Sequence, residues 1–389
     1  MPPLPARPRS RELVLAIGAS AALVGAAPAI GDFRRWLRLS FPGHFVSIVT
    51  AGIAAGSVAA LVAAFRRIRD RRLLRFGMIA LAVVVAIAYA QRSALGNADS
   101  DVVERVHFLE YGLVTWLFYR AWAPLGDVSA VVLGMLAAFT VGICEEGIEW
   151  FVPGRIGELR DVFLNGAAIV SGALVSWALR PVPVRVVRSA RSARAVLVVG
   201  AIAVATLSAF VDTVHIGHEI RDADGRTFRS IYTAEELGAL SVARRHQWDE
   251  HPPMERPARY AREDQYASEG LWHVQRRNNL WSSGDLSGAL NENRLLEEYF
   301  APVLDAPSYV SRTGHRWAPE QRADAERRSM APAQHALPFV SRAQGEFPIF
   351  TWSRTRFRAA SALLVLALLA AAFVAGRRLD YPVSEGAHR

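Results

Sequence analysis

The chain has 389 residues, of which 52% are hydrophobic, and a formal net charge of +9. All 45 basic residues are arginines. Their clusters lie mainly beside apolar runs, and no basic stripe with interleaved aromatic residues is visible on a soluble module, which argues against nucleic-acid binding. The single cysteine, Cys144, excludes an intramolecular disulfide, and its place in an apolar run predicts a packing role.

The apolar residues gather in runs of about 15 to 20 residues, the length that crosses a bilayer as a helix. The sequence therefore predicts about eight membrane spans. In chain order they are residues 13–30, 45–65, 76–90, 102–119, 128–144, 161–179, 195–211 and 357–375. The first run ends in Ala26-Ala27-Pro28-Ala29, which also has the small-residue pattern of a signal-peptide cleavage site; we favour an uncleaved span.

Residues 31–44 join the first two spans and combine three arginines with Phe33 and Trp36. Such a mixture of basic and large apolar side chains is typical of a segment at the membrane surface. We therefore expect a short interfacial piece here, separate from the first span.

Arginine clusters predict the orientation of the spans. The heaviest clusters follow the second, sixth and eighth spans, at residues 66–75, 180–194 and 377–378. Basic loops stay on the cytoplasmic side. We therefore expect a protein of the cytoplasmic (inner) membrane with both termini in the cytoplasm and residues 212–356 on the outer side.

Residues 212–356 are polar and contain no run of membrane length. Residues 271–305 have helical spacing of apolar positions, and Ser283-Gly284 predicts a break between two short helices. The flanks, residues 251–263 and 306–338, are predicted to be loops. The predicted fold class is an all-α integral membrane protein with a mainly helical, loop-rich extracytoplasmic insert. Its regions are residues 1–100 (three spans), 101–180 (three spans), 181–211 (a seventh span after a basic inner loop), 212–356 (the outer domain) and 357–389 (the last span and tail).

Ionisable and other polar residues converge at the predicted outer ends of the fourth, fifth and sixth spans. Because charge is costly beside apolar segments, such a group indicates a site or a buried ion-pair network. Its members are Glu104, His107, Glu110, Tyr111, Glu145, Glu146, Glu149, Arg155, Asp161 and Asn165.

Chemical roles can be assigned to this group as hypotheses. His107, with Glu110 or Glu149 as its partner, is a candidate general base, and a crowded glutamate pair is a candidate acid. Arg155 could hold a phosphate or carboxylate, and Glu104, Tyr111, Asp161 and Asn165 are candidate substrate contacts. The histidine, glutamate and aspartate side chains are also workable metal ligands, although we assign no metal and no cofactor. The structural alternative is that these residues only pair with one another and anchor the helix ends.

The predicted outer domain offers two weaker candidates. His215 and His218 lie three residues apart beyond a span, where we favour interfacial hydrogen bonding over metal binding. Trp272, Trp281 and Trp317 are more typical of a small hydrophobic core than of a ligand platform.

Three segments together resemble a known family of membrane proteins. They are His107-Phe108-Leu109-Glu110-Tyr111, then Glu145/Glu146 and Glu149 followed by Phe151-Val152-Pro153-Gly154-Arg155, then Asp161-Val162-Phe163-Leu164-Asn165. The family that they resemble is the VanZ-like family, named for teicoplanin resistance. The resemblance covers residues 101–179. It implies a multi-pass envelope protein whose shared polar residues, Pro153 and Gly154 included, face the outer side. No reaction follows from it, and the additional spans and the insert depart from a minimal family member.

Glu145-Glu146 also invites comparison with the EExxxR motif of CAAX-type intramembrane proteases. The position four residues after Glu146 is Trp150 and not arginine, and no downstream histidine pattern follows in residues 161–211. We therefore set this similarity aside.

Three functions remain as hypotheses. The first is a VanZ-like protein that acts at the outer membrane face on or near cell-envelope precursors or lipids, with the bilayer and an anionic envelope precursor or lipid as its partners. The second is a non-catalytic scaffold that recruits a partner through residues 212–356. The third is an ion-coupled transporter, disfavoured because no inverted repeat is visible. The sequence does not choose between an enzyme and a binding protein, and it gives no oligomeric state.

Overall fold

The computed structural model describes residues 9–94, 96–152, 155, 157–182, 190–250, 265–307, 311, 313–329, 338–344 and 347–380. The chain divides into two compact units. The first, which we call the bundle, comprises Met1–Ile148, Arg160–Phe210 and Arg358–Arg389. The second unit comprises Glu149–Leu159 and Val211–Phe357.

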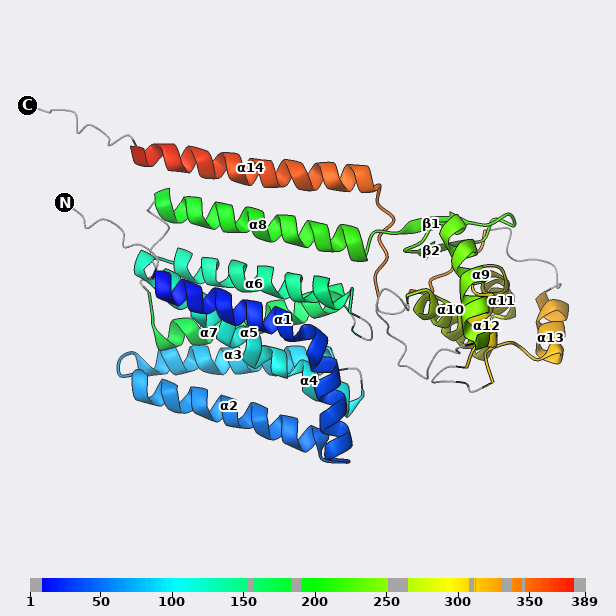
Figure 1. Ribbon diagram of the computed structural model, residues 1–389, viewed down its shortest axis with the longest axis horizontal. Helices are drawn as coiled ribbons and strands as arrows, with labels where there is room; N and C mark the ends of the chain where they lie inside the picture. Colours follow the sequence, from blue (N-terminus) through cyan, green and yellow to red (C-terminus); the bar gives the residue numbers. More distant parts are fainter. Residues whose placement is uncertain are drawn as a thin grey trace, which may run out of the picture. The chain divides into compact units, whose positions relative to one another are not determined.

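Long helices that run side by side build the bundle (Figure 1). They are α1 (Ser10–Ser40), α2 (Phe45–Arg67), α3 (Arg72–Arg92), α5 (Val106–Trp122), α6 (Ser129–Glu149), α7 (Leu159–Leu179), α8 (Ala190–Val214) and α14 (Arg354–Asp380), with the short α4 (Ala98–Glu104) and η1 (Ala123–Leu125). In the described part of the chain, seven of these helices, all but α5, α4 and η1, are long and apolar enough to cross a membrane. The predicted helical membrane class is confirmed at this level.

Burial separates central helices from peripheral ones. In the apolar window of α7, 56% of the residues are buried in the protein, against 6% in α2 and 11% in α3 and α14. The peripheral helices expose large apolar side chains such as Phe65, Leu74 and Leu363. A surface of this kind is costly in water, and a lipid bilayer is the solvent that suits it.

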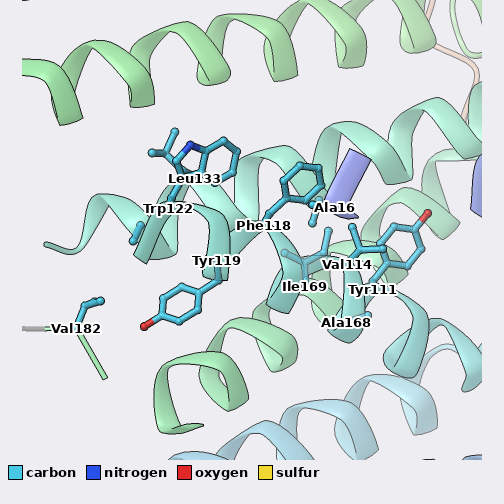
Figure 2. Packing of buried hydrophobic residues seen from close by; sticks show 12 residues of the cluster. Ala16, Tyr111, Val114, Phe118, Tyr119, Trp122, Leu133, Ala168, Ile169 and Val182 are labelled. Carbon is cyan, nitrogen blue, oxygen red and sulfur yellow. The ribbon is translucent and has the colours of Figure 1, made fainter. Parts of the chain in front are cut away.

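The core of the bundle forms where α5 meets α1, α6 and α7 (Figure 2). Aromatic side chains of α5, including Phe118 and Tyr119, pack against Ala16 of α1 and Leu133 of α6. Glycines bring the helices close: a Cβ atom on Gly172 of α7 would lie 2.7 Å from the Cα atom of Gly112 on α5. Small residues at helix crossings are typical of packing inside membranes.

Although α5 has only 17 residues, it runs from one end of the bundle to the other. Near its last turn, Arg120 donates to Glu12 at the start of α1, and Tyr119 donates to the Arg180 carbonyl after α7. Just before its first turn, Glu104 accepts from Arg160 at the start of α7. The helix therefore connects the same two ends as its long neighbours, which we call the arginine end and the Glu104 end.

Arg75 makes contacts at the arginine end with residues far away in the sequence. Arg75, at the start of α3, donates to the carbonyl oxygens of Ala178 (2.6 Å) and Leu179 (3.1 Å), and it pairs with Asp70. These contacts tie the α2–α3 loop to the end of α7.

Two predictions about the first 122 residues are wrong in detail. Residues 31–40 are not a separate piece, because α1 is continuous from Ser10 to Ser40, and only residues 41–44 lie outside it. The position of this segment at the membrane surface stays a prediction. Helix α1 contains Pro28, which removes one backbone donor, and Figure 1 shows the bend in the helix. The predicted span of residues 102–119 is divided at Arg105 between α4 and α5.

The second unit contains an antiparallel hairpin and five helices in the described residues. They are β1 (His218–Arg221), β2 (Thr227–Ser230), α9 (Ala234–Glu250), α10 (Gln265–Ser282), α11 (Leu286–Tyr299), α12 (Ala301–Asp305) and α13 (Pro319–Ser329). Phe228, Leu295, Leu296 and Phe300 are among the residues of its own hydrophobic core.

The predicted helix pair in residues 271–305 is confirmed as α10 and α11. Gly284 has a φ angle of +84°, a value that favours glycine, and it ends the first helix near the predicted break. The prediction of loops in residues 306–338 is wrong at α13, whose sequence is almost entirely polar and so shows no apolar periodicity. The strands were not predicted either, and residues 251–263 lie outside the described residues.

Candidate functional site

A buried acidic pair lies near the Glu104 end of the bundle. Glu145 and Glu146 of α6 are only 2% and 1% exposed. The Tyr111 hydroxyl of α5 donates to Glu145 Oε2, and Asn165 Nδ2 of α7 donates to Glu146 Oε1 at 3.4 Å. Three helices therefore bring four of the predicted residues together, and we call them the acidic centre.

Close helix approach makes the acidic centre possible. A Cβ atom on Gly142, one turn before Glu145 and Glu146, would lie 3.2 Å from the Asn165 side chain and 3.3 Å from the Tyr111 ring. Nothing in the sequence showed that the small size of Gly142 would matter.

His107 and Glu110 lie in the first turns of α5, and both are partly buried. The His107 ring stacks on Tyr111 with the two ring centroids 6.1 Å apart and the planes nearly parallel. His107 is thus in contact with a member of the acidic centre, as its helical spacing from Tyr111 predicts.

Arg160 holds a second group of predicted residues. It donates to Glu104 at 2.5 Å and to the Ser93 carbonyl at 3.0 Å, and it lies 3.0 Å from Asp161. Arg160 was absent from the predicted site, yet it joins the ends of α3 and α4 to the start of α7. For Glu104 and Asp161, the anchoring interpretation fits these contacts well.

Glu149 and Arg155 belong to the second unit and pair with each other. Glu149 is 5% exposed, and neighbouring Trp150 stacks on Phe347 with centroids 5.7 Å apart. The carboxylate of Glu149 therefore neutralises Arg155, the predicted anion clamp. Pro153 and Gly154 lie outside the described residues.

His215 contacts the end of the segment that contains Glu149 and Arg155. Its Nε2 accepts from the backbone N–H of Leu159 and its Nδ1 lies 2.9 Å from the Pro348 carbonyl, also at hydrogen-bonding distance. Burial lowers the pKa of His215 to about 4, so it is neutral at physiological pH. This agrees with the predicted hydrogen-bonding role. In the described residues, no three His, Cys, Asp or Glu side chains are grouped as metal ligands.

Another buried polar group, which the sequence did not suggest, combines Ser341, His273 and Glu292 in the second unit. The Ser341 hydroxyl donates to Glu292 Oε1 at 2.6 Å, while the other oxygen of Glu292 lies 2.7 Å from His273 Nδ1. In a catalytic triad the serine and the acid use opposite ring nitrogens. Here both approach Nδ1, so the group is a core network.

Two predictions about single side chains need correction. Cys144 is exposed on α6 and has no packing role in the core. Trp272 is a buried core residue as predicted, but Trp281 and Trp317 line a cavity.

Comparison with known proteins identifies no relative: no family model, no curated protein and no solved structure matches the chain.

Proposed function

We propose that this is a multi-pass protein of the cytoplasmic membrane that binds the polar group of a cell-envelope precursor or membrane lipid at its acidic centre. The buried pair Glu145 and Glu146 is the observation that carries the proposal. Placing two carboxylates among apolar helices is costly, and a chain that keeps them there gains a binding or proton-handling group in return.

The proposal includes eight spans, both termini in the cytoplasm and residues 212–356 outside. The course of α5 between the two ends of the bundle supports counting it as a span, although at about 1.5 Å per residue it is shorter than a typical bilayer core. With α5 included, the loops around Arg75 and Arg180 lie on the cytoplasmic side, as the positive-inside rule requires.

The residues that resemble the VanZ-like family give the proposal its chemistry. His107 and Glu110 lie beside the acidic centre and would supply polar or acid/base contacts to a head group. Arg155 and Glu149 are assigned a structural part in it, because they neutralise each other in the second unit.

Lipids that stay bound to the purified protein would test this function. The protein would be extracted with gentle detergent, and its bound lipids identified by native mass spectrometry in wild type, Glu145→Gln and Glu146→Gln. The matched control is Asp32→Asn, a carboxylate whose side chain is 83% exposed. We expect one lipid or lipid-linked precursor in wild type and control that is reduced about tenfold in both glutamine variants.

Equal lipid binding in all four proteins, together with lower melting temperatures for both glutamine variants, would show that the acidic centre is structural.

A scaffold is the second candidate, and the separate hydrophobic core of the second unit favours it. A scaffold predicts that deletion of residues 212–356 impairs the cell envelope while Glu146→Gln does not. Sensitivity of the source cells to envelope-directed antibiotics separates the two proposals. The first proposal predicts that Glu146→Gln impairs the envelope more than the deletion does.

A further inference from the structure

The second unit contains an open cavity of about 430 Å³ that no predicted function uses. Its walls come from the last turns of α10, from the segment before α13 and from α13 itself. Most of the lining side chains are polar, and two are tryptophans.

Arg277 of α10 is the charged group of this cavity. It is 3% exposed, and the acceptors of its hydrogen bonds in the described chain are all uncharged: Asn293 Oδ1 at 2.8 Å, the His315 carbonyl at 2.7 Å and Asn278 Oδ1 at 3.3 Å. Burial lowers the pKa of Arg277 to about 10, so it remains a cation at neutral pH. The carboxylate of Glu297 interacts with Arg277 electrostatically, but no carboxylate of the described residues is hydrogen-bonded to it. A buried cation of this kind attracts an anion.

The other charges around the cavity are already balanced. Arg316 forms a two-pronged pair with Asp305, and Glu297 accepts from Arg322 at 2.8 Å. Burial and the positive charge of Arg277 lower the pKa of His315, which keeps its ring neutral. The net charge offered to a ligand is therefore that of Arg277.

Two indole rings form the apolar part of the lining. Trp281 and Trp317 have ring centroids 5.3 Å apart and are tilted by 58°, and the Arg277 guanidinium lies 5.0 Å from the Trp317 ring centre. Both tryptophans are half-buried, which leaves part of each ring accessible. Around them are Asn278, Ser282, Ser311 and Gln321, whose amides and hydroxyls both donate and accept hydrogen bonds.

We propose that this cavity binds a small anionic saccharide, with its carboxylate or phosphate on Arg277 and one ring face against Trp281. A hydroxyl-rich ring suits the amide and hydroxyl rim, and its carbon-bound hydrogens suit an aromatic face. The volume is sufficient for one or two sugar rings.

The lining disfavours other ligand classes. A peptide would need pockets for apolar side chains, and among the described residues the two tryptophans are the only large apolar side chains of the lining. A cationic ligand would be repelled by Arg277.

Ligand preference of the full-length protein tests the proposal. The protein in lipid nanodiscs would be titrated with glucuronate, glucose 6-phosphate, glucose and inorganic phosphate, with calorimetry and tryptophan fluorescence as readouts. We expect a charged sugar to bind about tenfold more tightly than glucose and than phosphate. Glucuronate and glucose 6-phosphate distinguish carboxylate from phosphate recognition.

Two variants and one control locate the binding. Trp281→Ala should weaken binding of the charged sugar about tenfold, whereas Trp352→Ala, which removes an exposed tryptophan elsewhere in the second unit, should not change it. Arg277→Gln should remove the preference over glucose, and its melting temperature shows whether the fold is kept.

Absence of binding by both charged sugars to the folded wild type would overturn the proposal. The proposal would also be overturned if inorganic phosphate bound as tightly as glucose 6-phosphate and Trp281→Ala did not change this binding. The cavity would then be an anion site that does not recognise the sugar.

Discussion

Glu269 is the residue whose protonation bears most directly on the second unit. It is 1% exposed and accepts from the Ser230 hydroxyl at 2.5 Å and from the Ile231 N–H at 3.1 Å. Burial outweighs these hydrogen bonds and raises the pKa of Glu269 from 4.5 to about 7. The folded protein therefore keeps a proton that the unfolded chain loses at lower pH.

We expect the second unit to become less stable as pH rises from 4.5 to about 7, by on the order of 3 kcal/mol from this residue. The stabilisation is complete below pH 4.5 and is lost as pH passes the folded pKa. Thermal unfolding of the purified protein across this range measures it. Glu269→Gln should flatten the pH dependence, and an unchanged slope in that variant would assign the effect to another group.

At the scale of elements, the contact between α5 and α7 depends on two glycines. Gly112 and Gly172 let the backbones approach so closely that a Cβ atom on Gly172 would lie 2.7 Å from a backbone carbon. Backbone atoms cannot move aside as a flexible side chain can, so this position requires glycine.

We expect Gly172→Ala to lower the free energy of unfolding by about 1–3 kcal/mol through overpacking. Gly77 of α3 is the matched control, since no atom lies within 4 Å of the position that its Cβ would occupy. Gly77→Ala should be neutral or stabilising by up to about 1 kcal/mol, because alanine favours helix. The melting temperatures of the two variants in detergent measure the difference. Equal changes in melting temperature would show that α5 and α7 pack less closely than described.

Elements also show the limits of local sequence patterns. Hydropathy predicted the long helices well, because an apolar run is a local property. It placed no helix at α13, and it could not show that α1 continues from residue 30 to Ser40. In both cases the backbone hydrogen bonds, and not apolar periodicity, define the helix.

At the scale of the whole molecule, the orientation in the membrane depends on α5. If α5 is a span, the arginine end is cytoplasmic and residues 212–356 are outside. If it is not, the loops before α3 and after α7 would lie on opposite sides, against the positive-inside rule.

Labelling of single cysteines in intact cells tests the orientation. In a Cys144→Ser background, Glu320→Cys on α13 should react with a membrane-impermeant maleimide, while Arg69→Cys, next to α3, should react only after permeabilisation. Both positions are exposed. If Arg69→Cys were labelled in intact cells and Glu320→Cys were not, the topology would be the inverse of the one proposed.

The sequence by itself determined the membrane class, the long helices, the α10–α11 break and the group of polar residues at the ends of three predicted spans, because hydropathy and turn preference act over a few neighbouring residues. Only the tertiary structure decided which of the acidic side chains meet. It placed Glu145 and Glu146 beside Tyr111 and Asn165, and it put Glu149 and Arg155 together in the other unit. It also turned Trp281 and Trp317 from predicted core residues into the walls of a cavity around Arg277. Those outcomes depend on helix crossings between residues far apart in the chain, where burial and hydrogen-bond partners are set by three-dimensional neighbours.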